Sequence, residues 1–193
     1  MANSAKRLPE TPSQTAGPYV HIGLTPELAG LDHGPRGLGQ KIFPDGTSGQ
    51  PITIEGHVFD GSGTPVKDML IEVWQADSKG RYAAQGCDGW GRVTSDLQTG
   101  RYEINTIKPG PVDNTSGTLA PHVNLWLVAR GINIGLNTRL YFEDEAIANA
   151  DDSVFMSVIP RGRRDTLLAR TTENGYRFDI YLQGDAETVF FDV

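Results

Sequence analysis

The sequence predicts an all-β protein: a β-sandwich with an extended N-terminal arm and one or two short helices. The 193 residues include 23 glycines and 12 prolines, a composition typical of many turns between short strands. From residue 51 onward, short runs rich in β-branched and aromatic residues recur, each ended by turn residues. Helix-like sequence is confined to residues 143–150 (EDEAIANA) and 163–170 (RRDTLLAR), each only about two turns long.

The first fifty residues form the predicted arm. Residues 1–50 show no sustained hydrophobic period of either strands or helices. The stretch TAGPYVHIGL at 15–24 nevertheless carries apolar side chains that a free tail does not need. We therefore expect the arm to lie against another surface, either the body of this chain or a partner. Residues 51–193 then form the sandwich.

The strands of the sandwich follow from alternation and turn chemistry. Residues 52–59 (ITIEGHVF) and 65–75 (PVKDMLIEVWQ) flank the turn sequence DGSG and predict a hairpin. A second hairpin is predicted over residues 91–107, with Gly100 at its turn. Residues 122–129 (HVNLWLVA) are largely apolar on both faces, which predicts a central strand between two covering layers. Three further strands are predicted at 138–142, 176–182 and 187–191.

Charge and cysteine content exclude several classes of function. The formal net charge of −7 argues against a nucleic acid or an anionic membrane as partner. Cys87 is the single cysteine, so neither an internal disulfide nor a cysteine-based metal cluster is expected. No secretion signal and no membrane-spanning run of apolar residues is recognised, and we expect a cytoplasmic protein.

The residues most suggestive of chemistry lie at the start of the strand APHVNLW. His122 and Asn124 are two positions apart and therefore point to the same face of the strand. A metal site needs three or four ligands that converge from different strands, and no other histidine spacing supplies them. No nucleophile motif or phosphate-binding loop is present. From the residues alone, a buried histidine hydrogen-bonded to a neighbouring loop is expected.

Several stretches together resemble a known family. They are ETPSQTAGPYVHIGL (10–24), IEVWQADSKGRY (71–82), TIKPGPV (106–112), APHVNLW (120–126), ARGINIGLNTRLYFEDE (129–145) and YRFDIYLQGDAETVFFDV (176–193). In this order, and over nearly the whole chain, they resemble the alpha chains of the protocatechuate 3,4-dioxygenase family of intradiol ring-cleaving enzymes. The resemblance implies a β-sandwich, in agreement with the fold predicted from the pattern.

The resemblance also implies that this chain binds no metal. The catalytic beta chains of the family hold Fe(III) through two Tyr and two His, the histidines in the form His-x-His. Here His122 matches the first His, but Asn124 stands at the second, and Val112 stands where one Tyr is expected. Leu119 replaces an Arg of the same motif, and only Tyr82 matches the other Tyr. Tyr82, His122 and Asn124 thus form a vestigial site, and the iron is expected on a partner beta chain.

By the same resemblance, this chain lines the active site of the partner. The family assembles αβ protomers into larger oligomers, which cleave 3,4-dihydroxybenzoate with O2 to 3-carboxy-cis,cis-muconate. The arm then packs on the partner chain, and Arg130 suits the carboxylate of the substrate. Arg139 is a weaker candidate of the same kind. The pocket-lining residues that the resemblance implies are Thr15, Gly17, Pro18, Tyr19 and Arg130.

Other interpretations of the same sequence stay open. The chain could be a catalytically unrelated β-sandwich that serves as a binding or scaffold module with a vestigial metal site. It could also be a self-sufficient metalloenzyme that uses His122 and Tyr82 with further ligands. For Arg130, an ion pair at the surface or at an interface is as good an interpretation as a substrate contact.

Overall fold

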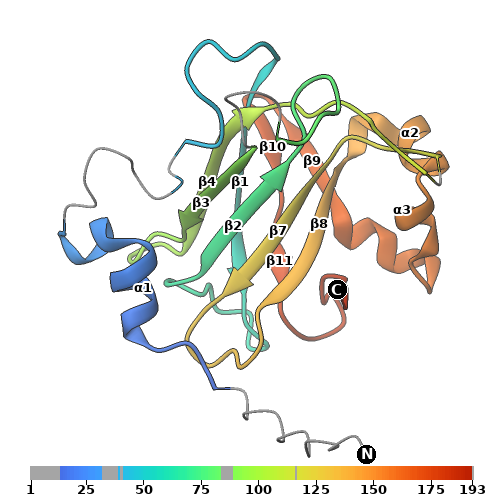
Figure 1. The fold of residues 1–193 in the computed structure, drawn as a ribbon. Helices are drawn as coiled ribbons and strands as arrows, with labels where there is room; N and C mark the ends of the chain where they lie inside the picture. The colour runs from blue at the N-terminus through green and yellow to red at the C-terminus, as the bar shows by residue number, and fades with distance from the viewer. Residues whose placement is uncertain (1–13, 32–38, 40, 84–88, 116, 193) are drawn as a thin grey trace, which may run out of the picture.

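The fold class predicted from the sequence is confirmed. The computed structural model describes residues 14–31, 39, 41–83, 89–115 and 117–192 (Figure 1). The start of the predicted arm and Cys87 lie outside these ranges. The strands are β1 (Pro51–Phe59), β2 (Leu70–Gln75), β3 (Trp90–Thr94), β4 (Arg101–Ile107), β5 (Val112–Asn114), β6 (Gly117–Leu119), β7 (His122–Val128), β8 (Leu136–Phe142), β9 (Leu168–Thr172), β10 (Gly175–Arg177) and β11 (Ile180–Tyr181).

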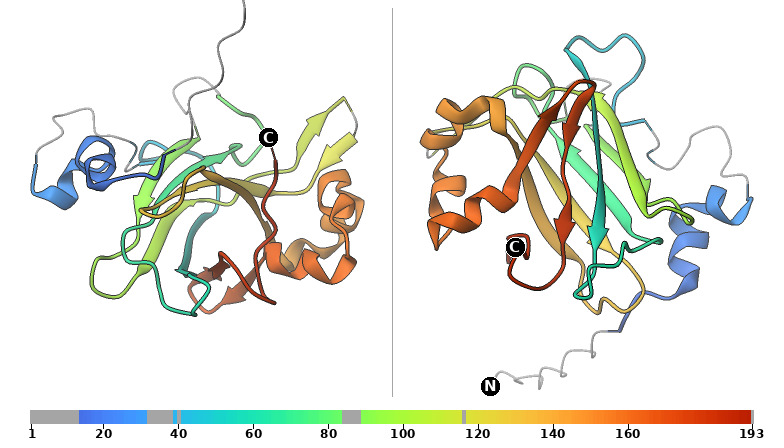
Figure 2. Two further views of the ribbon diagram at one scale, coloured as in Figure 1. Left: turned by 90° about the horizontal axis from the view of Figure 1, so that it is seen from below. Right: turned by 180° about the vertical axis from the view of Figure 1, so that it is seen from behind.

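The strands form two layers, seen most clearly in Figure 2. One layer contains β4, β1, β10 and β11, and the other contains β8, β7, β2 and β3. Strand β9 pairs with β10 and also with β8, so it joins the two layers along one edge. The short hairpin of β5 and β6 stands apart from this sheet.

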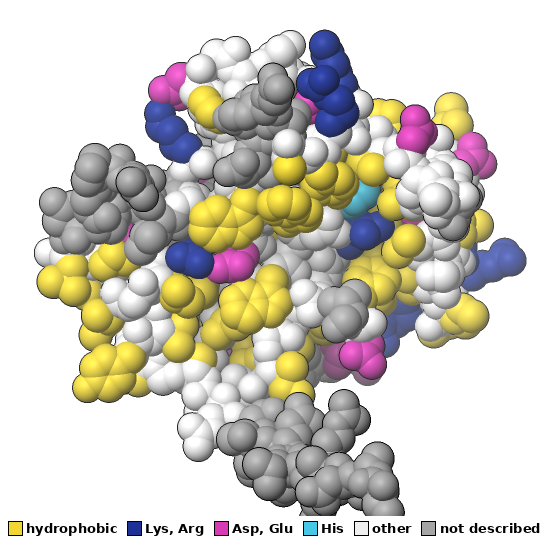
Figure 3. Space-filling view, viewed as in Figure 1, with side chains coloured by type: hydrophobic (Ala, Val, Ile, Leu, Met, Phe, Trp, Pro, Cys, Tyr) yellow, Lys and Arg dark blue, Asp and Glu magenta, His cyan; other side chains and the backbone are white. Residues whose placement is uncertain are grey.

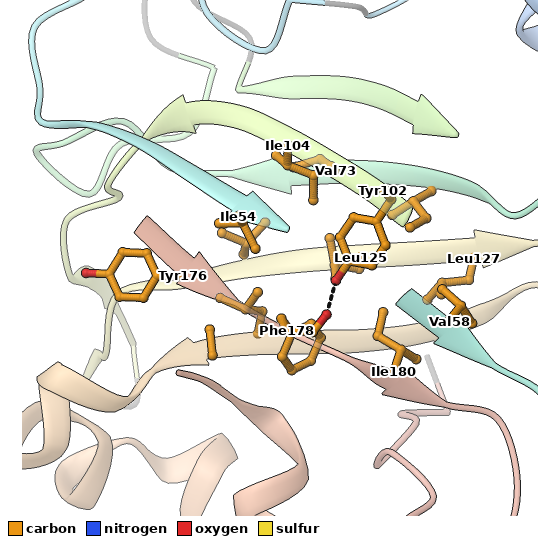
Figure 4. Packing of buried hydrophobic residues seen from close by; sticks show 14 of the residues in the cluster. Ile54, Val58, Val73, Tyr102, Ile104, Leu125, Leu127, Tyr176, Phe178 and Ile180 are labelled. Atoms are coloured by element: carbon orange, nitrogen blue, oxygen red, sulfur yellow. Dashed lines mark hydrogen bonds between the residues drawn. The ribbon is translucent and has the colours of Figure 1, made fainter. Parts of the chain in front are cut away.

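The core lies between the layers. Strand alternation places Ile54 and Val58 of β1 opposite Leu125 and Leu127 of β7, and all four side chains are buried (Figure 4). Tyr102 of β4 is also buried, and its hydroxyl donates to the carbonyl oxygen of Phe178. Each of these fully buried aliphatic side chains stabilises the fold by about 1.5–3 kcal/mol.

Both predicted turns are present, but neither predicted hairpin extends along its strands, and antiparallel pairing beside the first turn is limited to a bridge between Phe59 and Pro65. In the first turn, the Asp60 carboxylate accepts from the amide of Thr64 at 2.9 Å. Strand β1 nevertheless pairs with β4, whereas β2 pairs with β3 and β7 in the other layer. The second turn contains Gly100 with a φ of 75°, and it too leads from one layer to the other. The predictions were wrong because turn chemistry is local, whereas pairing is decided by the faces that the two layers bury.

The helices differ from the prediction in place. The predicted helix at 143–150 is confirmed as a 3-10 turn followed by α2 (Ala146–Asp151), and α3 (Ser153–Ser157) comes directly after it. The predicted helix at 163–170 is instead a 3-10 helix, Arg161–Leu167, that passes into β9. Within the predicted arm, α1 (Pro18–Leu24) precedes a 3-10 helix, Pro26–Ala29. A helix was not expected there, since α1 spans seven residues and buries none of them.

Part of the predicted arm packs on the body of this chain. Ile42 is buried in the core between the layers. The carbonyl oxygen of Gly39 accepts from the amide of Arg92 at 2.7 Å, and Gln50 accepts from the amide of Lys108 at 2.8 Å. Helix α1 and the α2–α3 pair lie at opposite sides of the sandwich (Figure 1).

Strand β7 positions the residues of the predicted vestigial site. It pairs with β2 on one side and with β8 on the other, which confirms a central strand within its sheet. Val123, Leu125 and Leu127 face the core. His122 and Asn124 point to the outer face of the sheet, where Asn124 is half-buried. A second apolar layer therefore does not cover this face over its whole length.

Candidate functional site

The three residues of the predicted vestigial site are in contact on the outer face of the sheet. His122 Nδ1 donates to the carbonyl oxygen of Ala120 at 2.6 Å. Because this bond places the proton on Nδ1, Nε2 accepts from the hydroxyl of Tyr82 at 3.0 Å. Asn124 Nδ2 donates to the same Tyr82 oxygen at 3.2 Å. Tyr82, which the resemblance aligned with a tyrosine ligand, therefore lies in hydrogen-bond contact with His122.

The neighbouring strand β8 extends this network with a cation. Arg139 lies opposite Asn124 in the register of β7 and β8, and its Nε donates to Asn124 Oδ1 at 2.9 Å. Arg139 Nη1 reaches the Tyr141 hydroxyl at 3.3 Å. Tyr141 in turn donates to Asp152 Oδ1 at 3.2 Å. One hydrogen-bonded chain therefore runs from Tyr82 through Asn124 and Arg139 to the start of α3.

Asp152 fixes the backbone next to His122. Its side chain is fully buried and accepts the amides of Val154 and Phe155, both at 2.8 Å, as the N-cap of α3. The other carboxylate oxygen accepts the amide of Ala120 at 2.8 Å. The residue whose carbonyl orients the His122 ring is therefore itself held by a buried carboxylate.

The surroundings set the protonation states of this network. Burial, and next the charge of Arg139, lower the pKa of His122 from 6.5 to about 4. Burial raises the pKa of the Tyr82 phenol, against smaller opposing effects of Asn124 and Arg139. Burial likewise raises the pKa of Tyr141. At neutral pH the imidazole is therefore neutral, and both phenols keep their protons.

A second group of predicted residues gathers at the start of the described arm. Ala16 forms a bridge with Arg130, and the amide of Gly131 donates to the Thr15 hydroxyl at 2.6 Å. Arg130 Nε donates to Asp68 at 2.5 Å, and the Arg130 side chain remains 62% exposed. The surface ion pair that was weighed for Arg130 is therefore present in this chain.

Helix α1 continues from this group and presents its aromatic residue outward. Gly17 is the N-cap and Pro18 occupies the first turn, where a missing amide proton costs nothing. Tyr19 is 81% exposed. His21 Nε2 lies 2.6 Å from the carbonyl oxygen of Asp68, which anchors the helix to the body. The structure thus brings Thr15, Gly17, Pro18, Tyr19 and Arg130 to one surface, which we call the arm face.

Known proteins match this chain over most of its length. Residues 29–184 match the family model described as Dioxygenase. The sequence is 46% identical to the protocatechuate 3,4-dioxygenase alpha chain of Pseudomonas putida, over 96% of this chain and 97% of that one. The chain belongs to the intradiol dioxygenase family.

Further relatives of this intradiol dioxygenase chain include both chain types. The protocatechuate 3,4-dioxygenase beta chain of Burkholderia cepacia is 32% identical over 94% of this chain and 86% of that one. Among solved structures, the dioxygenase domain of a carbohydrate-binding fusion protein from Streptomyces sp. SirexAA-E is 26% identical. It covers 82% of this chain and 97% of that chain with a TM-score of 0.59. The resemblance seen in the sequence is confirmed.

The residues around His122 do not fit the ferric ion that intradiol dioxygenases use. A ferric site needs phenolate oxygens and free imidazole lone pairs. Here the Nε2 lone pair of His122 accepts the Tyr82 proton, and Asn124 turns its NH2 group toward Tyr82. The Arg139 guanidinium adds a positive charge next to this donor set. Among the described residues, no three His, Cys, Asp or Glu side chains are grouped to hold a metal ion.

Sequence reasoning missed Tyr141 and Asp152 and underrated Arg139. The alternation of β8 places Arg139 and Tyr141 on the same face, and the pairing with β7 sets them opposite Asn124 and His122. The spacing of two between Arg139 and Tyr141 was visible in the sequence, but the strand register that sets them opposite Asn124 and His122 was not.

In the part of the chain that the structure describes, every helix is too short or too polar to span a membrane.

The lowered pKa of His122 predicts a pH-dependent stability. The folded state favours neutral His122, so its contribution is fully present above the unfolded pKa of 6.5 and is lost as the pH falls toward about 4. Between about pH 7 and about pH 4.5, we expect the free energy of unfolding of the wild type to fall about 2 kcal/mol more than that of His122→Gln. Urea unfolding at both pH values measures this difference. Parallel losses in the two proteins would contradict a buried neutral imidazole.

Proposed function

We propose that this chain is the non-metal-binding alpha subunit of a ferric intradiol dioxygenase and assembles with a homologous iron-binding beta chain. The reaction is the cleavage of 3,4-dihydroxybenzoate by O2 to 3-carboxy-cis,cis-muconate. One combined observation carries the proposal. The chain is 46% identical to a protocatechuate 3,4-dioxygenase alpha chain over 96% of its length, yet Asn124, at the position of a histidine ligand, accepts a hydrogen bond from the Arg139 guanidinium.

The arm face supports an active site that is shared with the partner. Tyr19 and Ile22 of α1 leave 81% and 42% of their surface exposed, so the helix presents apolar surface that a partner chain would bury. In this proposal the arm, residues 1–50, packs on the beta chain through α1, while its later part, with Ile42, lies against this chain's own sandwich domain of residues 51–193. The hydrogen bonds from the body to Thr15 and His21 hold the start of α1 in a fixed place for that contact.

Arg130 has the geometry to bind a carboxylate of the substrate. Asp68 engages Nε of Arg130 and thereby orients the guanidinium. Nη1 and Nη2 form no hydrogen bond with another described residue and offer a planar pair of donors. A carboxylate accepts such a pair bidentately, which fixes both the distance and the orientation of the aromatic ring.

In this proposal the two chains have different roles in the reaction. Ferric iron, held by the beta chain, supplies the coordination of the catechol and the reaction with O2. This chain orients the substrate through Arg130 and excludes water with the apolar surface around Pro18 and Tyr19. Because the beta chain of Burkholderia cepacia is itself 32% identical to this chain, the two subunits share a fold. We propose that such αβ protomers repeat in a larger oligomer.

Reconstitution tests the proposal directly. We expect neither this chain nor a homologous beta chain from the same organism to cleave 3,4-dihydroxybenzoate alone, and the co-expressed pair to consume O2 and substrate in equal amounts. Oxygen uptake and product absorbance measure the reaction. A chain that binds no such partner, or an active pair from which this chain can be removed without loss, would support the unrelated scaffold module instead.

Arg130 provides a sharper test within the reconstituted enzyme. We expect Arg130→Gln to lower kcat/KM for 3,4-dihydroxybenzoate about 10–100-fold, because a charge-assisted pair of hydrogen bonds is lost. Turnover of catechol, which lacks the carboxylate, should change about twofold or less.

A matched control exists for this substitution. The side chain of Arg170 is 56% exposed and forms one ion pair, with Glu143 at 3.1 Å, much as Arg130 pairs with Asp68. Arg170→Gln should leave both substrates unaffected. Equal losses for 3,4-dihydroxybenzoate and catechol in Arg130→Gln would argue against a contact with the carboxylate.

A further inference from the structure

A cavity of about 480 Å³ opens on the outer face of the β3–β2–β7–β8 layer, next to the vestigial site. This volume lies in the range of small-molecule sites, about 300–1,000 Å³. Hydrophobic side chains gather over this face in the space-filling view (Figure 3). The aromatic lining residues are Trp74, Trp90, Trp126 and Phe191, and the polar ones include Asn124, Asn137 and Arg139.

The aromatic walls are held in place before any ligand arrives. The Trp74 ring stacks on Tyr82, with ring centroids 5.7 Å apart and planes at 12°. Arg92 lies over Trp90, 5.0 Å from the ring centroid. A side chain at Gly135 would place its Cβ 2.1 Å from Trp126 Nε1, so the Trp126 ring can occupy this place only because residue 135 is a glycine. Fixed walls lower the entropic cost of binding a flat ring.

Arg139 carries a positive charge into this cavity without a carboxylate partner. Its hydrogen bonds go through Nε to the neutral Asn124 and through Nη1 to the neutral Tyr141. In the described part of the chain, Arg139 forms no ion pair, and its Nη2 donates to no other residue. Burial of a charge is costly unless the charge is compensated, so a half-buried arginine in such a place favours an anion.

The other charges of the cavity do not cancel this preference. Glu72 also lines the cavity, but Arg92 engages its carboxylate through Nε and Nη2 at 3.0 and 2.6 Å. Asp192 is the other carboxylate of the lining and is exposed to solvent. Asp152 is fully buried and reaches the network through Tyr141.

We propose that this cavity binds a single-ring aromatic carboxylate, whose carboxylate pairs with the free edge of the Arg139 guanidinium and whose ring lies among Trp74, Trp90 and Trp126. Guanidinium pairs with carboxylates through two parallel hydrogen bonds, and indole rings stack on an aromatic ring. The site uses side chains of this chain alone, so it does not depend on the proposed function. No covalent step is involved, since the cavity holds no activated nucleophile or base among the described residues.

Titration of the full-length chain with 4-hydroxybenzoate tests this site. We expect one equivalent to bind with a dissociation constant on the order of 0.1 mM, and to quench tryptophan fluorescence. Acetate, which has the charge but no ring, should bind at least about tenfold more weakly, and phenol, which has the ring but no charge, should do the same. Saturation by acetate or inorganic phosphate at the same concentration would show a general anion site and overturn the proposal.

Two substitutions separate the contribution of the Arg139 charge to binding from that of the aromatic side chains. Arg139→Gln should weaken 4-hydroxybenzoate at least about tenfold, and Trp126→Ala should weaken it about tenfold without affecting acetate. Arg170→Gln, remote from the cavity, is the control and should bind as the wild type does. In a complex with an iron-binding partner, Arg139→Gln should lower the number of 4-hydroxybenzoate sites by one per chain. Unchanged binding in both Arg139→Gln and Trp126→Ala, or no saturable binding at about 10 mM, would overturn the proposal.

Discussion

The hydrogen bond from Arg139 to Asn124 is the interaction on which the proposed lack of a metal site in this chain depends. It places a permanent positive charge beside His122 and Tyr82, the two side chains best suited to hold a metal ion. Burial, and next this charge, keep His122 neutral, and the lone pair on its Nε2 accepts a hydrogen bond from Tyr82. A network whose donors and acceptors satisfy one another is stable without metal. The chain thus keeps the family's fold, while the residues around His122 do not fit a ferric ion.

The rest of the structure is consistent with a supporting role. The same body that holds this closed network also holds the arm face, where Thr15 and Arg130 are anchored and Tyr19 is exposed. The arrangement leaves His122 buried in the polar network and Tyr19 of the arm exposed. The residues of the site and those of the core lie on opposite faces of β7, so the sandwich does not depend on a metal at His122.

The sequence predicts the layers better than their connections. Alternating residues such as Ile54 and Val58 identify strands with one buried face, because burial repeats with the period of a strand. The partners of those strands depend on contacts far apart in the chain, and both predicted hairpins failed for that reason. Helix α1 was missed because a seven-residue helix that buries nothing leaves no periodic signal. In the site, His122 and Asn124 were found by their spacing, whereas Asp152 acts through backbone amides that no side-chain pattern reveals.

The iron content of this chain, purified by itself after folding in the presence of ferric or ferrous iron, tests the central claim most directly. Metal analysis and the visible absorption spectrum should be measured on the same sample. If the guanidinium and the closed hydrogen-bond network exclude the ion, the chain is colourless and holds far less than one iron per molecule. One tightly held iron per chain, with the visible band of an iron–tyrosinate bond, would contradict the account.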